Sequence, residues 1–113
     1  MFEFLALLFI KHYVIDFVLQ TEAMVKGKGI YGNPDGIIHS LQHAFGTALA
    51  CFICIEQPFY WIVLPIADFL LHYHIDYVKV KYGCRDITKP LFWNHLGLDQ
   101  LLHSLTYLCF AFL

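Results

Sequence analysis

The chain has 113 residues, of which 59% are hydrophobic and 14% charged, and its formal net charge is −2. This length predicts a single domain over residues 1–113. The apolar content lies outside the range of soluble globular domains and indicates a membrane protein, and no nucleic-acid partner is expected. Four cysteines occur, but two of them fall within one apolar run, so no disulfide framework is implied.

Four apolar segments follow one another along the chain, each close to the ~20 residues that a helix needs to cross a bilayer. A backbone in lipid must satisfy its own hydrogen bonds, so each segment is expected to be a helix. Connections rich in Gly, Pro or charge separate the segments. The predicted fold is therefore an all-α four-helix transmembrane bundle. Its predicted spans are about Phe2 to Leu19, Ile38 to Ile55, Phe59 to Val78 and Leu91 to Leu113.

Basic residues concentrate in two of the three connections, which sets the predicted topology. By the positive-inside rule, the loops after the first and third spans are cytoplasmic. The chain is then expected in the inner (cytoplasmic) membrane, with four spans and with both termini outside the cytoplasm. The basic residues are Lys26 and Lys28 in the first loop and Lys79, Lys81, Arg85 and Lys89 in the second.

An internal repeat is the most specific pattern in the sequence. The segment HYVIDFV at residues 12–18 returns as HYHIDYV at residues 72–78, sixty residues later. The same offset pairs His39 with Asp99 and His43 with His103. We expect two helical hairpins of one design, at about residues 1–57 and 58–113, related by an axis along the membrane normal.

Each predicted span carries ionisable residues four positions apart, which places them on one helix face. Four such faces turned inward would make a polar core. Counted from the cytoplasmic ends, four histidines form a deeper layer, and three aspartates with one histidine form a shallower one. The predicted metal ligands are His12, Asp16, His39, His43, His72, Asp76, Asp99 and His103.

The chemistry of these residues suggests a dinuclear metal site. His and Asp bind Zn, Mn and non-haem Fe, and helical bundles build such sites from facing helices. We expect two divalent transition metal ions, Zn first and Mn or Fe as alternatives. A metal-bound water is the predicted nucleophile, because no Ser or Cys nucleophile lies beside a base. A hydrogen-bonded polar core and a proton or ion path remain open.

Other residues are expected to support this site. Gln20 and Gln100 are predicted to orient the ligands. Asp68, one turn deeper than His72, is predicted either to orient that histidine or to extend the polar path. Lys79 and His95, at the cytoplasmic mouth, are predicted to contact an anionic substrate. The alternatives are that Lys79 only sets the topology and that His95 is an interfacial residue.

Several stretches resemble a family of small integral membrane proteins from bacteria and phages, catalogued as domain of unknown function 3307. They are KHYVIDFVLQTEAMVKGK, HSLQH, HYHIDYVK and DQLLH, and they cover most of the chain in the family's order. The chain is also distantly similar to membrane-bound metal-dependent hydrolases, whose His-Arg pattern is missing here. This second resemblance implies hydrolase activity.

The sequence thus predicts an integral membrane, dinuclear metal-dependent hydrolase that acts from the cytoplasmic side on a phosphoester. The expected partners are the lipid bilayer and an anionic small molecule or lipid headgroup, with a homo-oligomer also possible. Two alternatives remain, a di-iron membrane oxidoreductase and a metal or proton transporter. The apolar far halves of the spans oppose the transporter. A non-catalytic interaction protein would leave the eight ligand-type residues unexplained.

Overall fold

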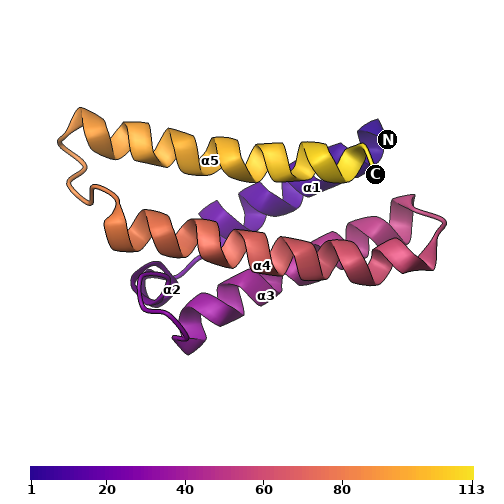
Figure 1. Ribbon diagram of the computed structural model, residues 1–113, viewed down its shortest axis with the longest axis horizontal. Coiled ribbons are helices and arrows are strands. Elements are labelled where there is room, and N and C mark those ends of the chain that lie inside the picture. The colour runs from indigo at the N-terminus through magenta and orange to yellow at the C-terminus, as the bar shows by residue number, and fades with distance from the viewer.

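The computed structural model describes residues 1–113, and it consists of helices joined by short connections (Figure 1). This confirms the predicted all-α class. A π-helical segment, η1, directly continues the first helix. The elements are α1 (Phe2–Tyr13), η1 (Val14–Val18), α2 (Glu22–Gly27), α3 (Pro34–Cys54), α4 (Pro58–Tyr82) and α5 (Pro90–Ala111).

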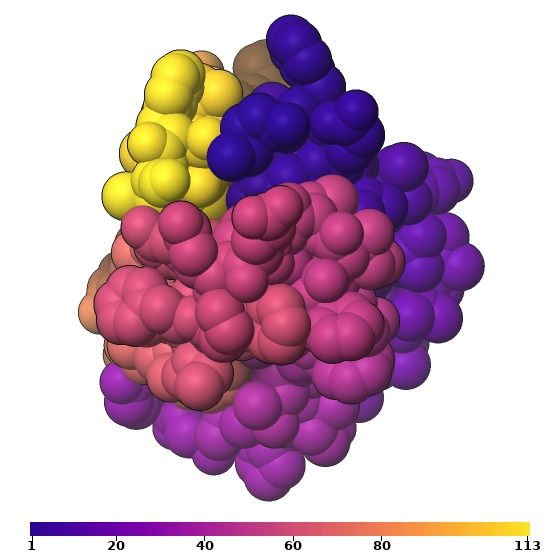
Figure 2. Space-filling model, turned by 90° about the vertical axis from the view of Figure 1, so that its right-hand side faces the viewer, coloured from indigo at the N-terminus to yellow at the C-terminus, as the bar shows by residue number.

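The four long helices run back and forth along the molecule. Both chain termini and the α3–α4 turn lie at one end, and the α4–α5 connection lies at the other (Figure 1). Figure 2 views the first of these ends, where the terminal residues sit beside the α3–α4 turn. Helix α3 packs against α1, α2 and α4, and α5 packs against α4 and α1. Each polar stripe can therefore face the others across one interior.

Proline and polar caps set where the helices begin. A proline opens α3, α4 and α5, where its missing N–H would have no helical partner anyway. Asn33 Oδ1 accepts the backbone N–H of Asp35 at 2.9 Å, so α3 starts before the predicted apolar run. Thr21 Oγ1 caps α2 by accepting the N–H of Met24 at 3.2 Å. Helix α2 was not predicted, because its six residues are far shorter than a membrane-spanning apolar segment.

The first span is not a regular α-helix to its end. The Leu19 N–H donates to the Val14 carbonyl at 2.9 Å, a bond across five residues. This π turn contains Asp16, one of the predicted ligands. The predicted helical segment over residues 2–19 is therefore present, but residues 14–18 have π rather than α geometry. Single π turns inside helices often occur at functional sites.

The interior is polar and the outside is apolar, the reverse of an ordinary soluble domain. More polar and charged side chains than hydrophobic ones are buried. Large apolar residues such as Phe45, Phe52 and Ile62 are each 66% exposed. Hydrophobic residues are buried together mainly near the termini, in a group that we call the terminal apolar cluster. It comprises Phe4, Leu8, Ala50, Cys51, Leu64, Tyr107 and Phe110.

One helix, α3, is long and apolar enough to cross a membrane by length and composition. Buried helices of soluble proteins meet the same standard, so the four predicted spans are not established in this way. Helix α1 has only 12 residues before the π turn. The polar residues of α4 and α5 lower the mean hydropathy of those helices, and these include the ligand-type residues of the interior.

The loop between α4 and α5 has its own local structure. The Thr88 hydroxyl and backbone N–H donate to Asp86 Oδ1 at 2.6 and 3.0 Å. These bonds favour the charged carboxylate and hold the pKa of Asp86 below its usual value. Arg85 donates to the Val80 carbonyl at the end of α4. The loop is thereby bound to the end of α4 and stabilised by hydrogen bonds within itself.

Candidate metal centre

The polar stripes meet in the middle of the bundle. Two groups of buried side chains converge there. Within each group, one ligand atom from every side chain lies within 4.8 Å of the others. His72 belongs to both groups. Six of the eight predicted ligands are thus brought together. The first group is Asp16, His39, His43 and His72, and the second is His72, Asp76 and His103.

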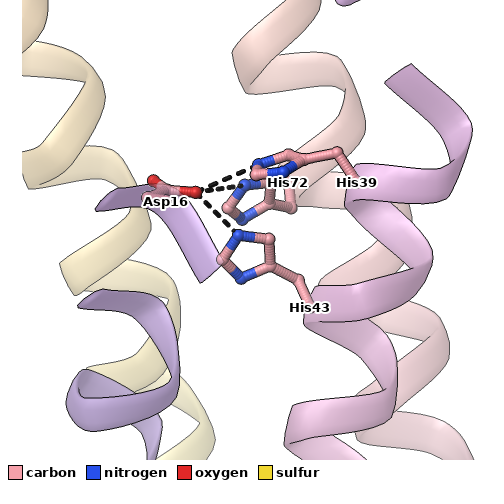
Figure 3. Close-up of side chains that lie close together, drawn as sticks. All are labelled: Asp16, His39, His43 and His72. Atoms are coloured by element: carbon pink, nitrogen blue, oxygen red, sulfur yellow. Dashed lines mark hydrogen bonds and ion pairs between the residues drawn. The ribbon is translucent and has the colours of Figure 1, made fainter. Parts of the chain in front are cut away.

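Asp16 is the centre of the first group, and three histidines point toward it in Figure 3. Its Oδ1 lies 3.0 Å from His39 Nε2 and 2.8 Å from His43 Nε2. The Nε2 of His72 is 3.8 Å from the same oxygen. The π turn supplies the carboxylate, α3 supplies two rings and α4 supplies one. The group therefore forms only when three elements pack together.

Asp76 is the carboxylate of the second group, as Asp16 is of the first. Its Oδ1 lies 3.0 Å from His103 Nε2, and its Oδ2 lies 3.2 Å from His72 Nε2. The Oδ2 atom is also 3.6 Å from His39 Nε2, which belongs to the first group. The two groups are therefore contiguous through His39 and His72.

The geometry of the two groups is compatible with a set of metal ligands. Tetrahedral coordination at about 2.0–2.1 Å places neighbouring donor atoms roughly 3.3 Å apart. The separations given above run from 2.8 to 3.8 Å. Both ring nitrogens of His39 and of His72 are buried without a hydrogen-bond partner. Buried polar atoms normally have hydrogen-bond partners. Nitrogen and oxygen atoms that point at one another without forming hydrogen bonds could instead share a bound cation.

Among the histidines of the two donor groups, His43 is the one with a hydrogen-bond partner at each ring nitrogen. Lys11 Nζ donates to His43 Nδ1 at 3.1 Å and to the His43 carbonyl at 3.2 Å. An acceptor Nδ1 places the ring proton on Nε2, which faces Asp16 Oδ1. A metal ion at this nitrogen must displace that proton.

His12 and Asp99 lie beside the two groups rather than within them. His12 Nε2 is 3.1 Å from Asp16 Oδ2 and 2.9 Å from Gln100 Oε1, and its Nδ1 is 2.9 Å from the Tyr107 hydroxyl. His12 thus contacts the Asp16 oxygen that faces away from the first group and can orient that carboxylate. Asp99 Oδ1 is 3.4 Å from His103 Nε2 and has no hydrogen-bond partner.

The four histidines assigned to the deeper layer do lie together. The rings of His43 and His72 stack at 3.6 Å, and those of His72 and His103 stack at 4.0 Å. The His12 ring is 5.2 to 5.8 Å from these three.

The predicted supporting residues divide into those that touch ligand side chains and those that do not. Gln100 contacts His12 and also donates to Asp99 Oδ2 at 3.0 Å. Gln20 donates to the backbone carbonyl of Asp16 at 3.0 Å, so it holds the π turn rather than the carboxylate. Asp68 does not orient His72, because its Oδ2 binds Lys11 and Thr47 instead. It extends the polar interior toward the terminal apolar cluster.

Two buried partners were missed, although the sequence carries a signal for each. Lys11 Nζ lies 2.7 Å from Asp68 Oδ2, and the two side chains are 10% and 1% exposed. Lys11 follows Leu8 by three residues, which places it on the buried stripe of α1. Tyr107 follows His103 by four residues and continues the polar stripe of α5.

Lys28 is a third missed residue, and no periodic pattern points to it. Its Nζ lies 3.0 Å from Asp76 Oδ2, and its side chain is only 8% exposed. The sequence placed it in a loop as a topology-setting residue. Folding of the α2–α3 connection over the bundle instead carries it into the interior, where it neutralises a carboxylate of the second group.

The predicted mouth residues lie close to one another. Lys79 Nζ is 3.7 Å from Asp99 Oδ2. His95 Nδ1 accepts the backbone N–H of Cys84 at 2.8 Å, and both Lys79 and His95 line one cavity. His74 points away from the ligand face, and its ring contacts Tyr31 and the Leu70 carbonyl.

A family model described as "Protein of unknown function (DUF3307)" matches residues 4–113. The chain belongs to this family. No curated protein and no solved structure matches the chain. The resemblance to the DUF3307 family is therefore confirmed, whereas the similarity to membrane-bound hydrolases stays a prediction. Because the family description names no activity, the function of this DUF3307 protein has to be argued from its site.

The site offers this DUF3307 protein a definite range of chemistry. Imidazole and carboxylate donors suit Zn, Fe or Mn, and the excess of imidazole favours Zn among these. Asp16 and Asp76 each have both oxygens near histidines, so each can contact more than one ion. Lys28 and Lys79 add cationic groups at the edge of the donors. This combination suits the binding and polarisation of an anionic ester.

Proposed function

We propose that the protein is an integral membrane metal-binding protein that hydrolyses a phosphoester at a dinuclear site. The observation that carries the proposal is the pair of buried donor groups that share His72 inside a helical bundle. A lone buried histidine is common. Six buried donors from three helices and a π turn, several of them without hydrogen-bond partners, are hard to explain without a cation.

The distribution of apolar side chains supports membrane insertion. A helix that exposes Phe45, Phe52 and Ile53 at 66–69% would aggregate in water, whereas lipid solvates it. Ionisable residues of membrane helices face the bundle interior and mark functional sites. The inverted interior of this bundle fits that pattern, and we extend it to four spans formed by α1 with η1, α3, α4 and α5.

The charge distribution along the bundle supports the proposed orientation. The connections that carry the basic residues are grouped at one end, and the termini with the α3–α4 turn are grouped at the other (Figure 1). The positive-inside rule then puts the α4–α5 loop and α2 in the cytoplasm. The mouth of the site, with Lys79 and His95, faces the same side.

Matching contacts support the proposed repeat. His43 meets Asp16 at 2.8 Å, and sixty residues later His103 meets Asp76 at 3.0 Å. The pairs within one helix match as well, with His12–Asp16 at 3.1 Å and His72–Asp76 at 3.2 Å. A two-fold arrangement of this kind supplies one carboxylate for each of two ions.

Bound metal would lower the pKa of a coordinated water and so supply the nucleophile for the ester. Asp16, Asp76 and the histidines of the two donor groups would hold the ions, which would also polarise the ester. Lys28, Lys79 and the bound ions would together neutralise the phosphate. The terminal apolar cluster closes the far end of the interior, which favours a one-sided site over a transporter path.

Metal analysis of purified protein tests the proposal. Wild type, His72→Ala and the control His74→Ala are compared by element-resolved mass spectrometry. His72 touches both donor groups, whereas His74 is on the same helix with an exposed ring. We expect bound transition metal in wild type and His74→Ala and its loss in His72→Ala. Equal metal content in wild type and both variants, or no bound metal in wild type, would refute the site.

Activity is then measured on bis(p-nitrophenyl) phosphate after refilling stripped protein with Zn, Mn or Fe. Hydrolysis that needs the added ion and disappears in His72→Ala supports the hydrolase. Bound iron with an optical change on exposure to oxygen, and no hydrolysis, would instead support the di-iron oxidoreductase.

A further inference from the structure

A groove lies between α4 and α5, at the end of the bundle that carries the basic residues. Its volume is about 480 Å³, within the range of roughly 300–1,000 Å³ that is usual for small-molecule sites. The groove has an apolar part and a polar part. The apolar walls are formed by Ile75, Val78, Leu98 and Leu102, and the polar end by Lys79, His95 and Asp99.

The apolar walls open onto the outer surface of the bundle. Val78, Leu98 and Leu102 are 53%, 51% and 41% exposed. In the proposed membrane orientation, this outer surface faces the acyl chains of the leaflet next to the basic loops. A hydrocarbon tail could enter the groove sideways without leaving the bilayer.

The polar end has groups that are free to bind a headgroup. The 3.7 Å separation of Lys79 Nζ and Asp99 Oδ2 is longer than a hydrogen bond, so the ammonium keeps its donors. His95 accepts a backbone N–H at Nδ1, which leaves the ring proton on Nε2 as a further donor. Asp99 Oδ1 is buried without a partner and leads to His103 of the second donor group.

We propose that this groove binds a membrane lipid with an anionic phosphate headgroup, with the phosphate at Lys79 and His95 and a tail between α4 and α5. The inference rests on the proposed function, because bound metal ions would have to neutralise Asp99, which otherwise repels a phosphate. It narrows the substrate of that site to a lipid.

The walls disfavour the other predicted substrate class, a nucleotide. A base and ribose carry several hydrogen-bonding groups, and burying these against aliphatic side chains without partners is costly. A lipid tail has no such groups, so an aliphatic wall suits it.

Lipid retention measured by native mass spectrometry tests the groove. Delipidated full-length protein in detergent, loaded with Zn, is incubated with dioleoyl phosphatidylglycerol, dioleoyl phosphatidylcholine or dibutanoyl phosphatidylglycerol. Leu98→Trp fills the groove, and Leu101→Trp is the control because Leu101 is 52% exposed on the same helix and does not line it. Lys79→Gln removes the headgroup cation.

We expect wild type and Leu101→Trp to retain the long-chain anionic lipid and Leu98→Trp to bind it about tenfold less tightly, since several methylene groups lose their contacts. Lys79→Gln should bind both long-chain lipids alike. Equal retention by Leu98→Trp, or equal binding of the dibutanoyl lipid, would overturn the groove. Zn content and hydrolysis of bis(p-nitrophenyl) phosphate, measured on the same samples, test the proposed function separately. Tail-dependent retention in protein that binds no metal would keep the tail in the groove, but it would refute the hydrolase and the metal-dependent headgroup contact.

Discussion

The buried pair of Lys11 and Asp68 offers a quantitative test of the polar interior. Its Nζ–Oδ2 distance is 2.7 Å, and the two side chains are 10% and 1% exposed. The Thr47 hydroxyl donates to the same carboxylate oxygen at 2.6 Å. The perturbations are Asp68→Asn, Lys11→Met and the double variant. Each single change strands one buried charge, and the double change removes both.

The expected magnitudes follow from the distance and the burial. At 2.7 Å and an effective dielectric constant of about 20, the attraction is roughly 6 kcal/mol before desolvation. Breaking a buried pair on one side typically costs about 3–5 kcal/mol, whereas replacing both partners is close to neutral. We therefore expect each single variant to lose about 3–5 kcal/mol of unfolding free energy. The double variant should lie within about 1–2 kcal/mol of wild type.

The assay is reversible unfolding of the purified chain in mixed micelles with increasing sodium dodecyl sulfate, followed by circular dichroism. A double-mutant cycle then isolates the coupling of the two side chains. Thr47→Val is a useful control, because it removes one hydrogen bond and leaves the ion pair, so its cost should be about 1 kcal/mol. Losses in the two single variants that simply add in the double variant would refute the pairing.

Three further predictions follow. Gly36→Ala should destabilise the fold by about 1–3 kcal/mol, because the new Cβ would lie 3.1 Å from the Gly27 carbonyl oxygen, whereas Gly97→Ala meets no atom within 4 Å and should gain about 0.5–1 kcal/mol by the same unfolding assay. Metal affinity measured by chelator competition should fall as the pH is lowered, because histidine ligands must lose a proton; affinity that is constant with pH would contradict a histidine site. Cys84 should react with a membrane-impermeant maleimide in inverted vesicles. A cysteine introduced by Glu56→Cys in a Cys84→Ser background should instead react in right-side-out vesicles. The opposite pattern of labelling would show that the topology is reversed.

Much of the helical architecture was predictable because it depends on local patterns. The four long helices follow from apolar segments of sufficient length, and their polar stripes follow from residues four positions apart. Proximity of the ligand-type residues was also predictable, since polar stripes on packed helices must face one another. The predicted depth of each residue rests on the predicted topology, whereas the stacked rings of His43, His72 and His103 show that three histidines of one predicted layer lie together.

Which donors come within bonding distance was not predictable. A polar stripe shows which face of a helix turns inward. It does not specify the rotation of the helix about its axis to within a few tens of degrees, or the distance between that helix and the next one. His12 therefore ends behind Asp16, with Gln100 and Tyr107 as its partners, although the sequence gives it the same rank as His72. The π turn at Asp16 has no signal in a pattern that assumes regular helices.

The sequence by itself determined the number of long helices, the polar face of each and the apolar character of their remaining surfaces, because these are properties of one segment at a time. The tertiary structure alone decided that the Lys28 side chain enters the interior and neutralises Asp76. It also decided that a groove lies between α4 and α5 beside Asp99. Both depend on contacts between residues distant in the chain. Such contacts are fixed only when all the helices pack together, since no single segment carries the free energy that selects them.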